Sequence, residues 1–419
     1  MASIPGGQFT FFAANKPVNV ALTPDGHPPP PPIPGDFNLE LITSPHGTSY
    51  AVPPGYQGVA SLSDGGHSVN LLSGDIGVYI TGSGPDTIHA GSGNDTIVGG
   101  FGSELIIGGS GHDLIYGGFG NDTITAGSGP TTIYGGHGND LLTGGTGADV
   151  IYGGFGQDTI TAGSGPTTIH GGHGNDVITG GSGADVIFGG RGPDTITAGS
   201  GPTTIFGGHG HDVITGGNGA DVIFGGQGPD TITGGGGPTT IYGGHGADVI
   251  TGGSGPTIIY AGDGPDTITA GSGPTTIYGG HGHDVITGGS GHDVIYGGGH
   301  DTITPGTGPT TIYGAHGDDG SGGHWSFGQG GGHGIGGDTI DGGGSTDPGH
   351  GHGQSGHDTM VGFGDVGHDA ISSGGQNPQN VDHVLATAQA HDGNTVITMP
   401  NGTTMTLVGT TNIDHIFPH

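Results

Sequence analysis

The 419-residue chain contains no cysteine, and its only basic side chains are Lys16 and Arg191. Without cysteine the chain has no disulfides, no thiolate zinc sites and no thiol nucleophiles. Because 36 acidic residues oppose two basic ones, the formal net charge is −34. A charge of this sign argues against direct binding to nucleic acid or to anionic lipid. We therefore expect cations as partners.

Apolar residues are also scarce, at 29% of the chain, whereas 109 residues are glycine. This composition excludes one conventional packed core for a chain of this length. No apolar run approaches the roughly 18 residues that a membrane span requires, so we expect no insertion into a membrane. The N-terminal residues lack both a basic stretch and a sustained apolar stretch, and we expect no cleavable signal peptide there.

What the sequence has instead is a nine-residue repeat. An apolar residue recurs at every ninth position from Ile88 to Ile295, and the pattern resumes at Ile303 and Ile312 after a one-residue deletion. The unit is Gly-Gly-x-Gly-x-Asp-x-Ile-x, as in residues 135–143 and 280–288. These residue types predict six turn-forming residues followed by a three-residue strand whose middle side chain points inward.

The nonapeptides resemble those of the RTX calcium-binding β-roll proteins, a bacterial secreted family. The resemblance implies a right-handed parallel β-roll in which two nonapeptides form one coil. It also implies that Ca²⁺ ions lie between the turns of successive coils, held by Asp carboxylates and turn carbonyls. We therefore predict an all-β fold, a β-solenoid of about 13 coils of about 18 residues, with multiple Ca²⁺ ions as its cofactors.

The Asp positions of alternate nonapeptides fall on two different edges of the predicted roll. The first edge has a carboxylate in every coil, whereas the second edge alternates between Asp and Thr. Glu104 and twelve Asp residues occupy the first edge, and the Asp residues predicted as ligands are Asp86, Asp122, Asp140, Asp158, Asp176, Asp194, Asp212, Asp230, Asp248, Asp266, Asp284 and Asp301. The predicted ligands of the second edge are Asp95, Asp113, Asp149, Asp185, Asp221 and Asp293. The Thr residues between them are Thr131, Thr167, Thr203, Thr239, Thr257, Thr275 and Thr310.

Threonine cannot supply a full negative charge to a metal ion. We therefore expect a continuous column of Ca²⁺ on the first edge and weak or vacant sites on the second. The entropy lost on ordering each glycine-rich coil exceeds what two buried Ile side chains return. We predict that the chain is largely disordered without Ca²⁺ and folds on binding it.

Two columns of outward side chains follow the inward Ile residues. One predicted face has Thr in nearly every coil. The other has a column of aromatic residues: Tyr116, Tyr134, Tyr152, His170, Phe188, Phe206, Phe224, Tyr242, Tyr260, Tyr278, Tyr296 and Tyr313. This column is interpreted either as an intramolecular ladder that stiffens the roll or as an interface, and the two interpretations are compatible.

The chain has 26 His residues, which raises the hypothesis of zinc binding. His137 and His173 occupy the third turn position of alternate coils, so the strand spacing places them about 10 Å apart. Ligands of one zinc ion lie about 2 Å from the metal, and these side chains cannot share one. We expect solvated turn residues there, whose charge can change with pH.

The ends of the chain differ from the repeats. We divide the chain into a non-repeat segment with a polyproline spacer (1–70), the roll (71–314), degenerate Gly/His-rich repeats (315–380) and a C-terminal cap (381–419). The first segment is expected to be irregular and to act as a cap or an assembly arm. The last segment is predicted to form a β-hairpin with a turn at Asn401-Gly402. This hairpin and the terminal residues resemble the uncleaved secretion region of RTX proteins exported by type I machinery, which implies an extracellular or cell-surface location.

No motif of an enzyme is present. The sequence has no GxSxG nucleophile motif, no HExxH motif and no long apolar helix for pore formation. We predict an extracellular, calcium-dependent structural protein: a surface-layer, filament or biofilm-matrix subunit that associates with itself through its faces or ends. A cell surface or matrix is a further expected partner. Two alternatives are an ice-binding protein, because of the regular Thr columns, and a carrier module for secretion or folding.

Overall fold

The computed structural model describes residues 84–298, 301–308 and 310–313 almost without interruption, and elsewhere little more than individual strands. In this described part the chain is an all-β parallel β-solenoid of about 13 turns of ~18 residues, as the sequence predicts, and it contains no helix. No helix of the described residues is therefore suited to crossing a membrane. By its contacts the chain divides into two compact units, Met1–Ile205 and Phe206–His419.

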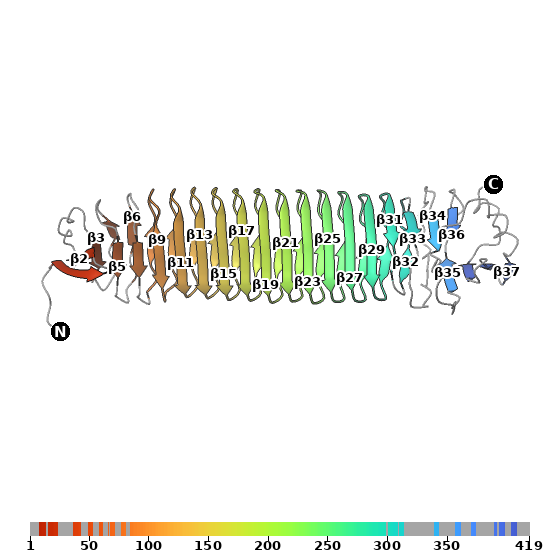
Figure 1. The fold of residues 1–419 in the computed structure, drawn as a ribbon, viewed down its shortest axis with the longest axis horizontal. Helices are drawn as coiled ribbons and strands as arrows, with labels where there is room; N and C mark the ends of the chain where they lie inside the picture. Colours follow the sequence, from red (N-terminus) through yellow and green to blue (C-terminus); the bar gives the residue numbers. More distant parts are fainter. Residues whose placement is uncertain are drawn as a thin grey trace. The chain divides into compact units, whose positions relative to one another are not determined.

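The coils of the first unit form two parallel sheets (Figure 1). Sheet A contains the longer strands β9 (Thr96–Gly100), β11 (Asp113–Phe119), β13 (Thr131–His137), β15 (Asp149–Phe155), β17 (Thr167–His173) and β19 (Asp185–Arg191). Sheet B contains the short strands β8 (Thr87–His89), β10 (Leu105–Ile107), β12 (Thr123–Thr125), β14 (Leu141–Thr143), β16 (Thr159–Thr161), β18 (Val177–Thr179) and β20 (Thr195–Thr197). Ile115 lies opposite Ile133 in sheet A and Ile124 opposite Leu142 in sheet B, so each coil repeats after 18 residues.

The strands of sheet A are longer than the three residues that the repeat predicts. They continue through the glycine pair that follows each inward Ile, and Gly118 pairs with Gly136 in the ladder. Both glycines have positive φ, 120° and 116°, and a Cβ at Gly136 would collide with the Gly118 carbonyl oxygen. Only glycine combines this backbone conformation with so close an approach, so the glycine pair extends the strand instead of ending it.

Strands that the nonapeptide pattern does not predict precede β8 and β9. They are β1 (Gln8–Ala13), β2 (Lys16–Thr23), β3 (Phe37–Ile42), β4 (Ser49–Val52), β5 (Gly58–Ser61), β6 (Ser68–Leu71) and β7 (Gly77–Ile80). The pair β1 and β2 is antiparallel, whereas β3, β5, β7 and β9 pair in parallel. Leu39 lies opposite Gly58, and Gly58 opposite Gly77, so these coils repeat after 19 residues. The predicted polyproline spacer at 27–36 lies outside the described residues.

The second unit repeats the same arrangement. Its longer strands are β21 (Thr203–His209), which contains the boundary between the units, β23 (Asp221–Gln227), β25 (Thr239–His245), β27 (Thr257–Asp263), β29 (Thr275–His281), β31 (Asp293–Tyr296), β33 (Thr310–Tyr313), β34 (Thr339–Gly342) and β36 (Ala370–Ser373). Sheet B of this unit consists of β22 (Val213–Thr215), β24 (Thr231–Thr233), β26 (Val249–Thr251), β28 (Thr267–Thr269), β30 (Val285–Thr287) and β32 (Thr302–Thr304).

Near the C-terminus a small separate sheet contains β35 (His357–Val361), β37 (Gln389–His391), β38 (Asn394–Thr398) and β39 (Thr404–Val408). The antiparallel pairing of β38 with β39 places Asn394 opposite Val408, which confirms the predicted hairpin. Its predicted turn at Asn401-Gly402 lies outside the described residues.

The core of each coil is narrow. One apolar side chain from each sheet points inward, and Ile115, Ile124, Ile133 and Leu142 are among those with no exposed surface. At both ends of this apolar layer the turns also bury carboxylates and hydroxyl groups. A coil therefore has a small hydrophobic centre between two polar edges, and the chemistry of the molecule lies at these edges.

Candidate metal sites along the turns

The structure places the predicted ligands in two separate columns of turns. A first-edge carboxylate such as Asp140 stands directly before a strand of sheet B, at the end of the turn that follows a strand of sheet A. A second-edge carboxylate such as Asp149 is the first residue of a strand of sheet A. Every predicted ligand on both edges, together with Glu104, is between 1% and 3% exposed. Burial of so many carboxylates requires partners for their oxygens.

On the first edge, Oδ1 of most Asp carboxylates accepts a hydrogen bond from a backbone N–H of the preceding coil. The Asp122 N–H donates to Asp140 Oδ1 at 2.8 Å, and the Asp140 N–H donates to Asp158 Oδ1 at 2.9 Å. The second unit repeats this contact, as from the Asp248 N–H to Asp266 Oδ1 at 2.8 Å. These bonds connect carboxylates one coil apart into a column along each unit.

The other oxygen of the first-edge carboxylates is different. It is buried and has no hydrogen-bond partner among the described residues, as seen for Oδ2 of Asp140, Asp158, Asp176, Asp230, Asp248 and Asp266. This oxygen lies beside the first glycine of its own turn and beside a carbonyl of the next coil. A Cβ built at Gly171 would lie 2.6 Å from Asp176 Oδ2 and 2.5 Å from the Gly189 carbonyl oxygen. Glycine therefore leaves open a small space on which oxygens from two coils converge.

Burial also perturbs the titration of these carboxylates. Desolvation, with the negative charge of the neighbouring carboxylates, raises the pKa of Asp140, Asp230 and Asp284 to about 7. Desolvation, with the same kind of repulsion, raises the pKa of Glu104 to about 9. The ionised column is therefore unfavourable by itself, and a divalent cation would relieve both the desolvation and the repulsion.

The donor set fits calcium. Among the described residues, no group of three or more His, Cys, Asp and Glu side chains is placed to hold a metal ion. A cation on the first edge would be held by carboxylates of successive coils together with turn carbonyls. Ca²⁺ binds such all-oxygen sets of carboxylates and carbonyls, whereas zinc prefers His and Cys. Calcium bound here would neutralise the column and tie each turn to the next.

On the second edge, the carboxylates have more hydrogen bonds. Asp149 accepts from the Thr131 N–H through Oδ1 at 2.9 Å and from the Gly145 N–H through Oδ2 at 2.7 Å. The pKa of Asp149 is also raised by burial, and these two N–H groups oppose the rise. The two edges that are similar in sequence therefore differ in how their carboxylates are satisfied.

The predicted aromatic column is confirmed as a stacked ladder on the outer face of sheet A. Tyr134 lies between Tyr116 and Tyr152, with ring centroids 4.8 and 4.7 Å apart. In the second unit, Tyr260 lies between Tyr242 and Tyr278 in the same way. Because neighbouring rings cover each other's faces, only the ring edges face solvent.

A second ladder was missed by the sequence analysis. We call it the turn ladder, and it consists of Phe101, Phe119, His137, Phe155 and His173, stacked with centroids 4.7 to 5.2 Å apart. His137 and His173 are therefore not simply solvated turn residues, because each stacks on phenylalanine. Examining the third turn position at every coil, instead of only at the His coils, would have revealed this ladder.

A family model described as RTX calcium-binding nonapeptide repeat matches the chain in overlapping segments that together span residues 73–312. No curated protein matches the chain. Among solved structures, the chain is similar to the X-ray crystal structure of a hyperactive, Ca²⁺-dependent, β-helical antifreeze protein from an Antarctic bacterium. That likeness has 19% sequence identity, covers 65% of this chain and 85% of the other, and has a TM-score of 0.32.

Proposed function

The chain belongs to the family of RTX calcium-binding nonapeptide repeat proteins and binds multiple Ca²⁺ ions, and we propose that it is an extracellular structural protein that assembles with copies of itself. In this proposal calcium folds and stiffens the roll, and the stiffened roll is a subunit of a surface layer, a filament or an extracellular matrix. The proposal includes no catalytic activity. The buried carboxylates of the chain are spread along the two edges, one per coil on the first edge and fewer on the second, and catalysis would require them to gather in one cleft.

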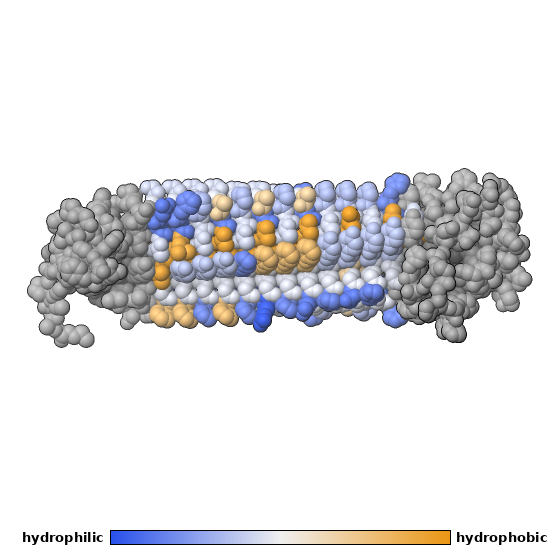
Figure 2. All heavy atoms as spheres, viewed as in Figure 1, coloured by the Kyte–Doolittle hydropathy of each residue, from blue (hydrophilic) through white to orange (hydrophobic). Residues whose placement is uncertain are grey.

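The observation that carries self-assembly is the exposed turn ladder of the first unit. Phe101, Phe119 and Phe155 are 61%, 49% and 52% exposed, although they belong to a regular stack. Figure 2 shows hydrophobic residues lying in lines that cross successive coils. A line of exposed apolar rings is unusual on a soluble monomer and marks a surface that excludes water when a partner covers it.

The kind of partner follows from the stacking. Since the ring faces are covered within the ladder, they are not available to stack on sugar rings or on free cations. The exposed ring edges form a ridge that repeats at every coil. A second copy of the chain offers a surface with the same repeat distance, so identical contacts can recur along the whole line. Calcium on the first edge lowers the net negative charge that otherwise keeps copies apart.

Sedimentation velocity and negative-stain electron microscopy, each with EDTA and with about 10 mM Ca²⁺, test this proposal at a calcium level that saturates weak extracellular sites. We expect ordered assemblies only with calcium. Phe155→Ser should abolish them without unfolding the roll, because the side chain is half exposed. The matched control is Val177→Ser, which removes a side chain of similar exposure, 46%, from sheet B. A monomer in calcium, or equal effects of the two variants, would contradict self-assembly through the turn ladder.

The extracellular location is part of the same proposal. A chain that lacks order at the low calcium of a cytosol and folds in millimolar calcium outside can pass through a narrow export conduit unfolded. The C-terminal residues 381–419 are proposed as the type I export signal. Deletion of these residues should leave the protein inside the producing cells when the export machinery is present, and continued secretion would contradict the assignment.

A second candidate function is ice binding, favoured by sheet B. The third residue of every short strand in the first unit from β12 onward is Thr, and Thr125, Thr143, Thr161, Thr179 and Thr197 lie in register. The first strand position, however, alternates Thr with Leu or Val, as at Thr159 and Val177. A flat surface with regularly spaced hydroxyls and methyls is the feature that this function would use. Measured thermal hysteresis or ice shaping would favour it, and their absence would exclude it.

A further inference from the structure

The two edges of the roll treat their carboxylates differently, and in four Asp turns of the second edge both carboxylate oxygens accept hydrogen bonds. In Asp113, Asp149, Asp185 and Asp293, Oδ1 accepts an N–H from the preceding coil and Oδ2 accepts the N–H of a glycine four residues earlier. On the first edge, Oδ2 of Asp140 has no such donor among the residues that the structure describes. In these second-edge turns a glycine N–H thus occupies Oδ2, which is the oxygen that would bind a cation on the first edge.

The Thr turns between these Asp turns are closed in another way. The Thr167 hydroxyl lies 3.0 Å from the Ala162 carbonyl oxygen and 3.1 Å from the Gly165 carbonyl oxygen, and it donates to them. The Thr275 hydroxyl makes the same contacts with Ala270 and Gly273, at 2.7 and 3.0 Å. The turn carbonyls, which could otherwise coordinate a cation, therefore accept a hydrogen bond from the Thr hydroxyl instead.

In four of the seven second-edge Thr turns a methyl group also fills the remaining space. The residue five positions before each first-edge carboxylate is usually glycine, and the oxygens of two coils converge beside it, as at Gly171. The corresponding residues of second-edge Thr turns include Ala126, Ala162, Ala198 and Ala270, all of them fully buried. Ala261 is a first-edge exception, in the turn of Asp266.

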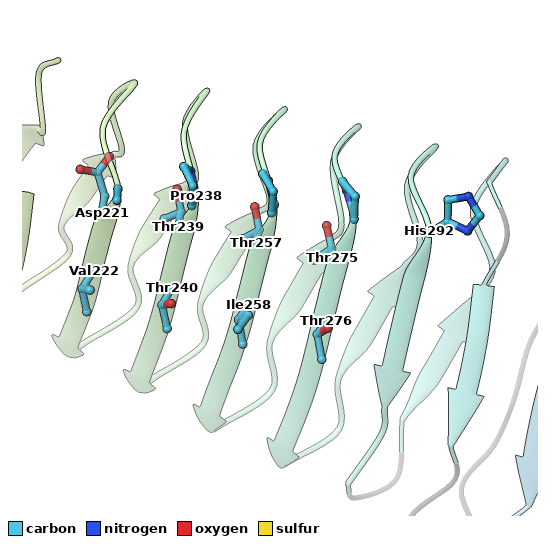
Figure 3. A pocket seen from close by; sticks show the side chains of 13 residues that line it. Asp221, Val222, Pro238, Thr239, Thr240, Thr257, Ile258, Thr275, Thr276 and His292 are labelled. Atoms are coloured by element: carbon cyan, nitrogen blue, oxygen red, sulfur yellow. The ribbon is translucent and has the colours of Figure 1, made fainter. Parts of the chain in front are cut away.

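The second unit extends this pattern over three consecutive coils. Thr239, Thr257 and Thr275 follow one another on the second edge, so three turns in succession lack a carboxylate. These side chains line a shallow groove of about 470 Å³ together with Pro238, Pro256 and Pro274. Figure 3 shows the three Thr side chains on successive coils. Among the described residues that line this groove, Asp221 is the only one with a carboxylate. The groove provides no set of charged oxygens for a cation.

From these contacts we infer that calcium occupies only the first edge, and that the second edge is closed by the hydrogen bonds of its own Asp and Thr side chains. Asp113, Asp149, Asp185, Asp221 and Asp293, whose Oδ2 accepts a glycine N–H, are then structural residues and not calcium ligands. The inference does not extend to Asp95, for which this Oδ2 contact is not seen among the described residues. The inference depends on calcium binding by the repeats and is independent of self-assembly. The first edge of the roll then depends on metal, whereas the second edge is held together by hydrogen bonds within the polypeptide.

The experiment counts bound calcium by equilibrium dialysis against free Ca²⁺ followed by atomic emission. The first edge alone supplies about 12 sites, one for each pair of successive carboxylates, whereas two occupied edges would supply about twice that number. We expect the lower number. A count near two ions per coil would overturn the inference.

Matched double variants assign the ions to an edge. Asp149→Thr with Asp185→Thr introduces the residue that other second-edge turns already have, and the calcium count should not change. Asp140→Thr with Asp158→Thr on the first edge removes ligands from three successive sites, so about a quarter of the bound calcium should be lost. If the first-edge variant does not fold, Asp140→Asn with Asp158→Asn, which keeps the shape of the side chains, replaces it. Equal calcium loss in the variants of the two edges would overturn the inference.

Discussion

Asp122 and Asp140 lie one coil apart on the first edge, and the Asp122 N–H donates to Asp140 Oδ1 at 2.8 Å, while Asp140 Oδ2 is buried and has no hydrogen-bond partner in the described part of the chain. The first oxygen holds the backbone of two coils in register. The second is an uncompensated acceptor, and it meets a carbonyl of the following coil beside a glycine. We therefore expect the stacking of coils to depend on a cation that binds the remaining oxygen.

Calcium removal is therefore expected to dissolve the fold. The apolar core has only two inward side chains per coil, and the first-edge carboxylates repel one another without metal. We expect the far-UV circular dichroism of strands in millimolar Ca²⁺ to be lost when EDTA is added at neutral pH and to return when calcium is restored. An unchanged spectrum after chelation would contradict the prediction.

The pH dependence should reverse between the calcium-free and calcium-bound states. In the fold, the pKa values of Asp140 and Asp230 are raised from 3.8 to about 7 and that of Asp158 to about 6, mainly by desolvation. A folded-state pKa above the unfolded value means that the fold binds protons more tightly. This stabilisation is fully present below the ordinary Asp pKa and is lost as the pH rises through about 6 to 7.

Without calcium, circular dichroism should thus show more order at about pH 5 than at about pH 8. In saturating calcium the order should instead decrease on acidification, because protons compete with Ca²⁺ for the same oxygens. Circular dichroism recorded as a function of pH, with EDTA and with saturating calcium, shows whether order rises or falls on acidification in each state. A calcium-free protein that is equally disordered at both pH values would contradict the raised pKa values.

Ala261 and Ala162 occupy equivalent turn positions on opposite edges, and removing their methyl groups should have different effects. Ala261→Gly opens the space beside Asp266, so we expect a lower calcium concentration at the folding midpoint. Ala162→Gly lies on the hydrogen-bonded edge. There we expect the unfolding free energy to fall by only about 0.5–1 kcal/mol, because glycine adds backbone freedom to the unfolded chain. The calcium midpoint should shift no more than in other variants that lose the same stability. Calcium titrations followed by circular dichroism compare the two, and identical responses would contradict the division of the edges.

The stacked ladder on sheet A should contribute to stability inside one molecule. Tyr134 contacts rings on both sides, so Tyr134→Ser should lower the unfolding free energy by about 1 kcal/mol or more in calcium. Tyr134→Phe keeps the ring and is the control, with an expected effect close to zero. Thermal unfolding in saturating calcium measures both. Equal midpoints for the Ser and Phe variants would show that the stacking contributes nothing.

Much of the architecture could be predicted because the repeat is strict. The nine-residue spacing of Ile115, Ile124 and Ile133 identifies two inward positions per coil, and their burial in opposite sheets confirms it. The coils around Gly58 and Gly77 could not be found in this way, since they repeat after 19 residues without the Gly and Asp pattern. Their place in sheet A depends on ladder hydrogen bonds, which any residue with a backbone N–H can make.

The sequence by itself determined the nine-residue period, the inward Ile positions and the two columns of turns, because glycine, Asp and Ile recur at fixed places in the unit, and its resemblance to RTX repeats implied the fold class and calcium. The tertiary structure alone decided how the carboxylates of Asp140 and Asp149 differ. Both occupy the sixth place of the same Gly-Gly-x-Gly-x-Asp unit. Yet the Oδ2 of one is without a hydrogen-bond partner among the described residues, and that of the other accepts the Gly145 N–H. The physical reason is that the direction of each carboxylate is set by donors in its own turn and in a coil 18 residues away, which the motif does not record.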